Sequence, residues 1–222
     1  MAKQNINIDG LMDKISISNA NSCAGLVPLS SYVIFYNQIN TNLRDCCIQS
    51  LINKLNSMAG IPLGSLTIAD LLQPLIFDKG IYLFKEGTQY HLMVNNPPNN
   101  INLTDYWYIG KCTSRSFQER LGGHLSIQPG NYMNTLIKRI AWVMSNTSYD
   151  DFKKKDFKFR ETYHHCAADV MKQLNLIFIS FKGCSNPKDK IEQLEKCLID
   201  GLHPYLNFPK RGVFKKSKLS IT

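Results

Sequence analysis

The sequence predicts an α/β (α+β) fold: a small central antiparallel or mixed sheet flanked by helices, with an N-terminal helical extension. Two observations support this class. After Lys79, short apolar runs of strand type alternate with amphipathic helical runs, and the first strand-like runs follow one another through short turns. Before Lys79, helix-like runs prevail. With 222 residues, 44% of them hydrophobic, the chain can bury a sizeable core.

The N-terminal third carries no catalytic motif. Residues 1–28 are polar and rich in Asn and Ser, whereas "CCIQSLINKLNSMAG" and "SLTIADLLQPLI" are typical of helices. Ser65 or Thr67 can cap the second helix, and Pro74 ends or kinks it. We therefore expect residues 1–78 to form a helical accessory region.

The remaining two thirds contain the strand signals. We expect strands at "GIYLFKE", "YHLMV", "DYWYIG" and "LIFISF", with "NNPPNNIN" as a loop. The run "SRSFQERLGGHL" predicts a helix, in which Ser116 and Glu119 form a capping box. Further helices are expected at "YMNTLIKRIAWVM", at "ETYHHCAADVMKQL" and at "PKDKIEQLEKCLIDGL", the last beginning at Pro187.

The net positive charge lies in the second part of the chain. Residues 1–78 hold four Lys/Arg and five Asp/Glu, a net charge of −1, whereas residues 79–222 hold 22 and 12, a net charge of +10. Such a domain suits a polyanionic partner, and we expect nucleic acid rather than a membrane because no basic amphipathic helix is evident.

The cysteine content and the N-terminal sequence indicate the cellular compartment of the protein. The seven cysteines are an odd number without a C-x-x-C pair, which favours reduced thiols over a disulfide framework or a zinc site. No apolar run approaches membrane-spanning length, and "MAKQNINIDGLMDK" lacks the sections of a secretory signal. We therefore expect a cytoplasmic protein.

Glu195 lies on the apolar side of the last predicted helix. At 100° per residue, Ile191, Leu198 and Leu202 fall close to it around the helix. A carboxylate turned toward a core requires a cation or hydrogen-bond donors. Two interpretations remain open: a buried ion pair with an Arg or Lys, or a metal ligand or general base.

Arg120 and His124 share one face of the earlier predicted helix. An arginine offers a planar fork to phosphate oxygens, and a histidine one turn away can hydrogen-bond or transfer a proton. The alternative is an ordinary solvated helix face.

Four motifs occur in a meaningful order: "GIY", "YIGK", "RLGGH" and "EKCLIDGLHPYLN". This order resembles the GIY-YIG nuclease superfamily, whose module has a three-stranded antiparallel sheet flanked by helices. In its excision-repair members the glutamate is followed nine residues later by Pro and twelve later by Asn, as Glu195 is by Pro204 and Asn207. The resemblance covers residues 79–209, with insertions at about 87–104 and 127–175.

The resemblance implies a site residue by residue. Glu195 would bind one divalent ion, Mg²⁺ or Mn²⁺, and Tyr82 would be favoured to activate the attacking water, with Tyr108 beside it. Charge on the phosphate would be stabilised by Arg120, although Arg115 competes for this role because Arg120 lies two residues further from Tyr108 than in compact members. Other site residues would be Lys111, which supports a tyrosinate or binds phosphate, and His124 and Asn207, each of which would hydrogen-bond within the site.

Two basic stretches favour contact with a DNA backbone. The first is "KKKDFKFR", with Lys153, Lys154, Lys155, Lys158 and Arg160; the alternative interpretation of this stretch is a solvated loop without a DNA contact. The basic tail, residues 210–222, contributes Lys210, Arg211, Lys215 and Lys216.

Together these features predict a metal-dependent endonuclease that hydrolyses double-stranded DNA to 5′-phosphate and 3′-hydroxyl ends. Its size suggests a restriction-type enzyme, a homodimer if it is sequence-specific. The alternatives are a nuclease toxin or effector of low specificity, and a noncatalytic nucleic-acid-binding module that retains the fold.

Overall fold

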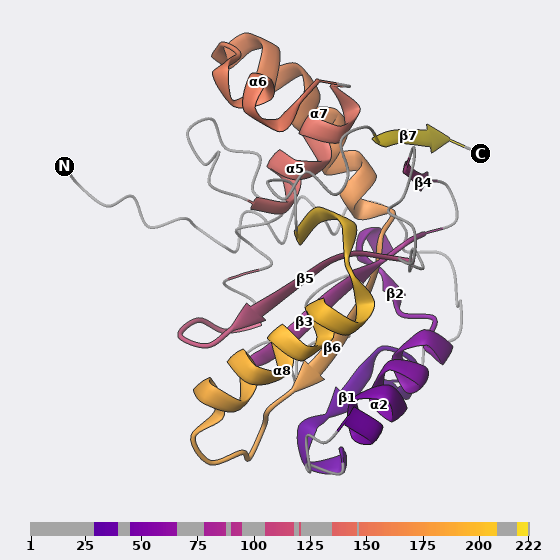
Figure 1. Ribbon diagram of the computed structural model, residues 1–222, viewed down its shortest axis with the longest axis vertical. Coiled ribbons are helices and arrows are strands. Elements are labelled where there is room, and N and C mark those ends of the chain that lie inside the picture. The colour runs from indigo at the N-terminus through magenta and orange to yellow at the C-terminus, as the bar shows by residue number, and fades with distance from the viewer. Residues whose placement is uncertain are drawn as a thin grey trace, which may run out of the picture.

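The structure, a computed structural model, describes residues 29–39, 45–65, 78–87, 90–94, 105–117, 120, 135–145, 147–207 and 217–221. A mixed five-stranded sheet lies at its centre, with helices packed around it (Figure 1). This arrangement confirms the α/β class that the alternation of strand and helix runs predicts. The polar residues 1–28 and most of the run "SLTIADLLQPLI" lie outside the described part.

The central sheet brings the two tyrosine-bearing strands together. Its strands are β1 (Val33–Phe35), β2 (Ile61–Pro62), β3 (Gly80–Lys85), β5 (Tyr106–Cys112) and β6 (Asn175–Ser180). The order is β1-β6-β3-β5, with β2 beside β6, and β3 is antiparallel to both β5 and β6. Strand β5 therefore forms one edge of this sheet.

The described part of residues 1–78 is only partly helical. The predicted helix is confirmed as α2 (Asp45–Ser57), but β1 pairs in parallel with β6 and β2 pairs antiparallel with it. The prediction of a helical region is thus wrong for residues 33–35 and 61–62. The apolar side chains of Val33, Ile34 and Ile61 are buried there, because the edge of β6 away from β3 is open to pairing.

The predicted strand "YHLMV" forms outside the central sheet. It is β4 (Tyr90–Val94), which pairs antiparallel with β7 (Ser217–Ile221) from the C-terminal tail. Both edges of β3 are already occupied by β5 and β6, so β4 takes a partner elsewhere. Part of the expected basic tail is therefore a strand.

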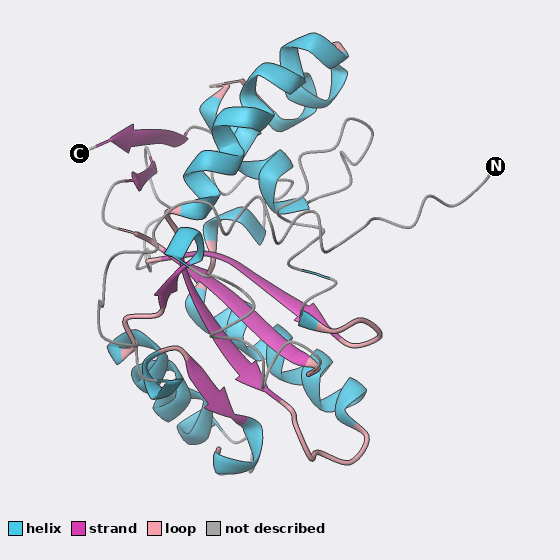
Figure 2. Cartoon of the chain, turned by 180° about the vertical axis from the view of Figure 1, so that it is seen from behind, coloured by secondary structure: helices cyan, strands magenta, loops and turns pink. Residues whose placement is uncertain are grey.

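Two groups of helices pack against side chains from the two faces of the sheet. One face, with Ile81, Leu83 and Ile109, packs against α2 and α8 (Pro187–Leu202). The other face, with Tyr82 and Phe84, packs against α5 (Thr135–Met144), α6 (Tyr149–Lys154) and α7 (Phe157–Lys172). Figure 2 shows the strands running side by side and the α5–α7 group beyond one end of them. The core predicted by the apolar periodicity thus has two layers, one on each side of the sheet.

Candidate active site

Tyr82 and Tyr108 lie next to each other on the face that packs against α5–α7. In the register of β3 and β5, Tyr82 pairs with Gly110 and Phe84 pairs with Tyr108, so the two tyrosines are diagonal neighbours. Their ring centroids are 6.3 Å apart, and the residues are 0% and 9% exposed. The prediction of two tyrosines on adjacent strands is confirmed.

Gly110 makes room for the ring of Tyr82. A Cβ atom at position 110 would lie 2.3 Å from Cζ and 2.4 Å from the hydroxyl oxygen of Tyr82, far closer than Cβ atoms come to such groups in proteins. The glycine of "YIG" is thus explained by the aromatic ring that lies over it.

The surroundings of the two hydroxyls differ. Burial, followed by the neighbouring Tyr108, raises the pKa of Tyr82 well above its ordinary value, and Arg120 opposes this effect. Burial also raises the pKa of Tyr108, but Arg139, Arg120 and a hydrogen bond with Tyr82 all lower it. Glu195 raises both. Tyr108 is therefore the phenol with more groups favouring its ionised form, whereas the resemblance favours Tyr82.

Of the two candidates Arg115 and Arg120, the structure places Arg120 near the tyrosines. Its Nε donates a hydrogen bond to the carbonyl of Lys111 at 3.5 Å, and its charge acts on both phenols. Arg115 is exposed and has no hydrogen bond or ion pair with any described residue. This placement favours Arg120 for the predicted role. His124 lies outside the described residues.

The carboxylate of Glu195 is paired with Lys111. The Nζ of Lys111 lies 2.9 Å from Oε2 of Glu195 and 3.9 Å from Oε1 of Glu192, and the side chain of Glu195 is 17% exposed. The structure thus contains the ion pair that the first interpretation of Glu195 predicts. The side chain of Glu195 is also mostly buried, as the helical pattern predicts. Because Glu195 and Glu192 are three residues apart on α8, both face the same ammonium group.

The residues around Lys111 fit a divalent cation with few protein ligands. Two carboxylates on consecutive turns already face one positive charge, and carboxylate oxygens suit Mg²⁺ or Mn²⁺, which keep several waters and take substrate phosphate oxygens. Among the described residues, no three His, Cys, Asp or Glu side chains converge. Glu195 would be the principal ligand, and the ammonium of Lys111 would have to give way.

Asn207 is bonded to the free edge of β5. Its Oδ1 accepts from the N–H of Ile109 at 2.9 Å, and its Nδ2 donates to the carbonyl of Ile109 at 2.8 Å. The side chain therefore takes the place of a neighbouring strand, immediately beside Tyr108. It belongs to η4 (Tyr205–Asn207), which follows α8, so it joins the helix bearing Glu195 to the strand bearing Tyr108.

Arg139 is the residue of this site that the sequence analysis missed. The guanidinium carbon lies 5.6 Å from the centroid of the Tyr108 ring, and an Nη donates to the carbonyl of Leu206. The Nε is buried without a hydrogen-bond partner among the described residues. Arg139 shares a helix face with the buried Leu136 and Val143, so a charge within an apolar stripe, the signal that singled out Glu195, also marks it.

Replacement of Arg139 by methionine should destabilise the fold by about 2 kcal/mol, because it removes both the hydrogen bond to Leu206 and the cation–π contact. Urea unfolding measures this loss. Arg139→Lys, which keeps the charge, should lose less. An Arg139→Met protein as stable as the wild type would contradict the importance of these contacts.

The predicted DNA-binding stretch "KKKDFKFR" is divided between two helices. Lys153 and Lys154 end α6, and the side chain of Asp156 caps α7 by accepting from the N–H of Phe159 at 2.8 Å. The alternative of a solvated loop is therefore wrong for all but Lys155 and Asp156. In the tail, the predicted contacts Lys210, Arg211, Lys215 and Lys216 lie outside the described residues.

The chain as a whole gives three further findings. In the segments that the structure describes, no helix combines the length and the apolar character that crossing a bilayer requires. Among the described residues, Cys112, Cys166, Cys184 and Cys197 form no disulfide. Comparison with known protein families, with curated protein sequences and with solved structures finds no match to this chain.

Proposed function

We propose that this protein is a metal-dependent endonuclease that hydrolyses phosphodiester bonds of double-stranded DNA. The observation that best supports the proposal is that a buried tyrosine pair, an arginine and a glutamate all lie around the edge strand β5. Tyr82 and Tyr108 lie on one face of the sheet, and the Lys111–Glu195 pair lies on the other. The charges of Arg120 and Glu195 act on both phenols, so these groups share one electrostatic environment.

Each residue has a role that its surroundings suit. A tyrosine near two arginines can, once ionised, accept a proton from the attacking water and become the neutral phenol. We assign this role to Tyr108, with Tyr82 hydrogen-bonded to its phenolic oxygen. Arg120 stabilises the charge that develops on the phosphate. Lys111 neutralises Glu195 in the absence of substrate. Asn207 holds the edge of β5, and with it Tyr108, in position.

A Mg²⁺ or Mn²⁺ ion bound at Glu195 would neutralise negative charge on the scissile phosphate and on the leaving oxygen. The chain's own contribution is the carboxylate that holds the ion. We further infer that the enzyme acts in the cytoplasm, which agrees with the free thiols among the described cysteines.

A second candidate is a noncatalytic DNA-binding module. The observation that favours it is the 2.9 Å ion pair between Lys111 and Glu195, which gives the carboxylate a structural partner. The nuclease candidate predicts cleavage of DNA and the noncatalytic candidate predicts none, whereas both predict binding of DNA.

The deciding experiment is incubation of supercoiled plasmid with the protein in Mg²⁺, in Mn²⁺ and in EDTA. We expect nicked and linear products with either metal and none in EDTA. Discrete fragments would indicate a restriction-type enzyme, and progressive smearing a toxin or effector of low specificity. A plasmid that stays intact in every metal but is retarded on a gel would establish the noncatalytic alternative.

Cleavage should accelerate with pH. Both phenols have raised pKa values, so only a small fraction is ionised near neutrality, and this fraction grows about tenfold for each unit of pH below the pKa. Initial rates between about pH 6 and pH 9 at saturating Mg²⁺ measure the slope. Tyr108→Phe should lose most activity and flatten the profile; a steep profile that persists in Tyr108→Phe and disappears in Tyr82→Phe would transfer the role of base to Tyr82.

A further inference from the structure

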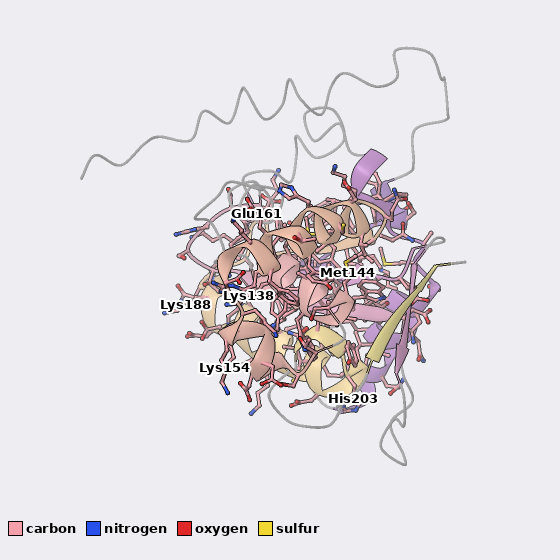
Figure 3. All side chains as sticks on the ribbon, turned by 90° about the horizontal axis from the view of Figure 1, so that it is seen from above. Lys138, Met144, Lys154, Glu161, Lys188 and His203 are labelled. Carbon is pink, nitrogen blue, oxygen red and sulfur yellow. The ribbon has the colours of Figure 1, made fainter. Side chains whose placement is uncertain are left out.

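A group of cations lies on the helices α5–α7, outside the candidate active site. Its members come from three elements: Lys138 on α5, Lys153 on α6, and Arg160 and His164, one turn apart, on α7. Lys138 and Arg160 are partly buried, and His164 is 8% exposed. We call the three charged members, Lys138, Lys153 and Arg160, the insertion cations. In the view from above, Lys138 and Lys154 lie on one side of the molecule (Figure 3).

Two of the insertion cations have no carboxylate counterpart in the part of the chain that the structure describes. Lys153 is paired with Asp150 at 2.8 Å, but neither Lys138 nor Arg160 has an ion pair with any described residue. Arg160 donates from Nε to the backbone carbonyl of Asp156 at 3.4 Å, which leaves its other donors available. Partly buried cations without acids are an unfavourable arrangement unless an anion approaches them.

The electrostatics of the group agree with this geometry. Burial, then Arg160 and Lys153, lowers the pKa of Lys138. Burial, then Arg160, Lys138 and the neighbouring His165, lowers the pKa of His164. From α6, the aromatic ring of Phe152 also lies close to that of His164, with centroids 6.5 Å apart. Like charges therefore destabilise one another here, and a bound anion would relieve the repulsion.

Helix α5 links the insertion cations to the candidate active site. Consecutive residues of a helix point about 100° apart. Arg139 therefore faces the ring of Tyr108, while Lys138 lies near Arg160 and Lys153. A polyanion that occupies the site beside Tyr108 can continue past α5 to the cations next to it.

We propose that α5–α7 form a second phosphate-binding surface, in which Lys138 and Arg160 contact the backbone of duplex DNA away from the scissile bond and His164 lies behind them. This inference rests on the proposed function for the identity of the polyanion. The exposed Lys154 and Lys158 extend the surface on the same two helices. Repeated phosphates suit such a surface, because each cation meets a separate charge.

Binding of a duplex of about 20 base pairs tests the inference, measured by fluorescence anisotropy in EDTA so that metal-dependent cleavage does not interfere. The variant Lys138→Gln/Arg160→Gln should bind about a hundredfold more weakly at low salt, and its slope of log K against log salt should be shallower by about two. The matched control is Lys172→Gln, which removes a charge from α7 that is already paired with Asp169 at 3.0 Å. This control should bind nearly as tightly as the wild type.

His164 provides a second, independent measurement. When phosphate neutralises Lys138 and Arg160, the pKa of His164 should rise from its lowered value, so binding takes up a proton. Affinity should therefore increase as the pH falls from about 7 to about 5.5, and this increase should be lost in His164→Gln but kept in the control His165→Gln, whose side chain is exposed.

The outcomes separate this inference from the proposed function. If Lys138→Gln/Arg160→Gln binds DNA like Lys172→Gln, or if the protein binds no duplex DNA, the second phosphate surface is overturned. If the wild type binds DNA through these residues but cleaves nothing in any metal, the surface stands and the nuclease proposal fails.

Discussion

Replacement of Glu195 by glutamine is expected to abolish plasmid cleavage while leaving the protein folded and able to bind DNA. The substitution keeps the size of the side chain but removes the charge that would hold a divalent ion. Loss of such a ligand should reduce the rate by at least about a thousandfold. The measurement is the initial rate of plasmid nicking in Mg²⁺, with far-ultraviolet circular dichroism as a check on folding.

The stability of Glu195→Gln should change little. The lost ion pair with Lys111 is partly solvated, since the two side chains are 17% and 34% exposed, and such pairs contribute about 1 kcal/mol or less. Asp200→Asn is the matched control, because it removes the same charge from an exposed position of the same helix. We expect it to cleave like the wild type.

Two results would contradict this assignment. If Glu195→Gln cleaved DNA as fast as the wild type, Glu195 would not be a catalytic residue, and its role would be limited to the ion pair with Lys111. Equal losses in Glu195→Gln and Asp200→Asn would attribute the effect to the net charge of α8 rather than to a ligand.

Replacement of Gly110 by alanine is expected to have the largest effect on stability. The added methyl group would lie 2.3 Å from Cζ of Tyr82, a fully buried ring on the neighbouring strand. The ring cannot rotate away without displacing its neighbours in the core, so the free energy of unfolding should fall by about 3 kcal/mol. Urea unfolding followed by circular dichroism measures the change.

Gly201→Ala is the matched control for this substitution. A Cβ atom at position 201 would approach Cδ1 of Ile52 to 2.6 Å, but this atom ends a flexible side chain, and Gly201 is exposed on α8. Alanine also favours a helix by about 1 kcal/mol over glycine. We therefore expect stability within about 1 kcal/mol of the wild type. Similar losses in both variants would show that the ring of Tyr82 does not set the requirement at position 110.

Much of the local structure was predictable because it depends on residues close in sequence. The run "PKDKIEQLEKCLIDGL" predicted α8 from its first residue, and the same periodicity placed Glu195 on a largely buried face. Strands β3, β4, β5 and β6 were also predicted, since short β-rich runs between turn residues are a local signal. The pairing of β3 with β5 was expected from the resemblance, but the partner of β4 was not, since β4 pairs with β7 at the far end of the chain.

The contacts that define the site depend on residues far apart in sequence. Asn207 bonds to Ile109 across 98 positions, and Arg139 on α5 reaches Tyr108 on β5. Periodicity can mark a charge on an apolar face, but it cannot say which ring or carboxylate that charge will meet. For Glu195 the sequence left a cation partner open, and only packing identified Lys111.

The sequence by itself determined the class of the fold, the strands that carry Tyr82 and Tyr108, and the burial of Glu195, because each follows from patterns repeated every two or 3.6 residues. Only the tertiary structure decided that the ring of Tyr82 lies over Gly110 and that Arg139 stands over Tyr108. The same is true of Val33–Phe35, which join the central sheet as a parallel strand. These features arise when separate elements compete for the same sheet edges and core volume, and that competition is settled only by the packing of the whole chain.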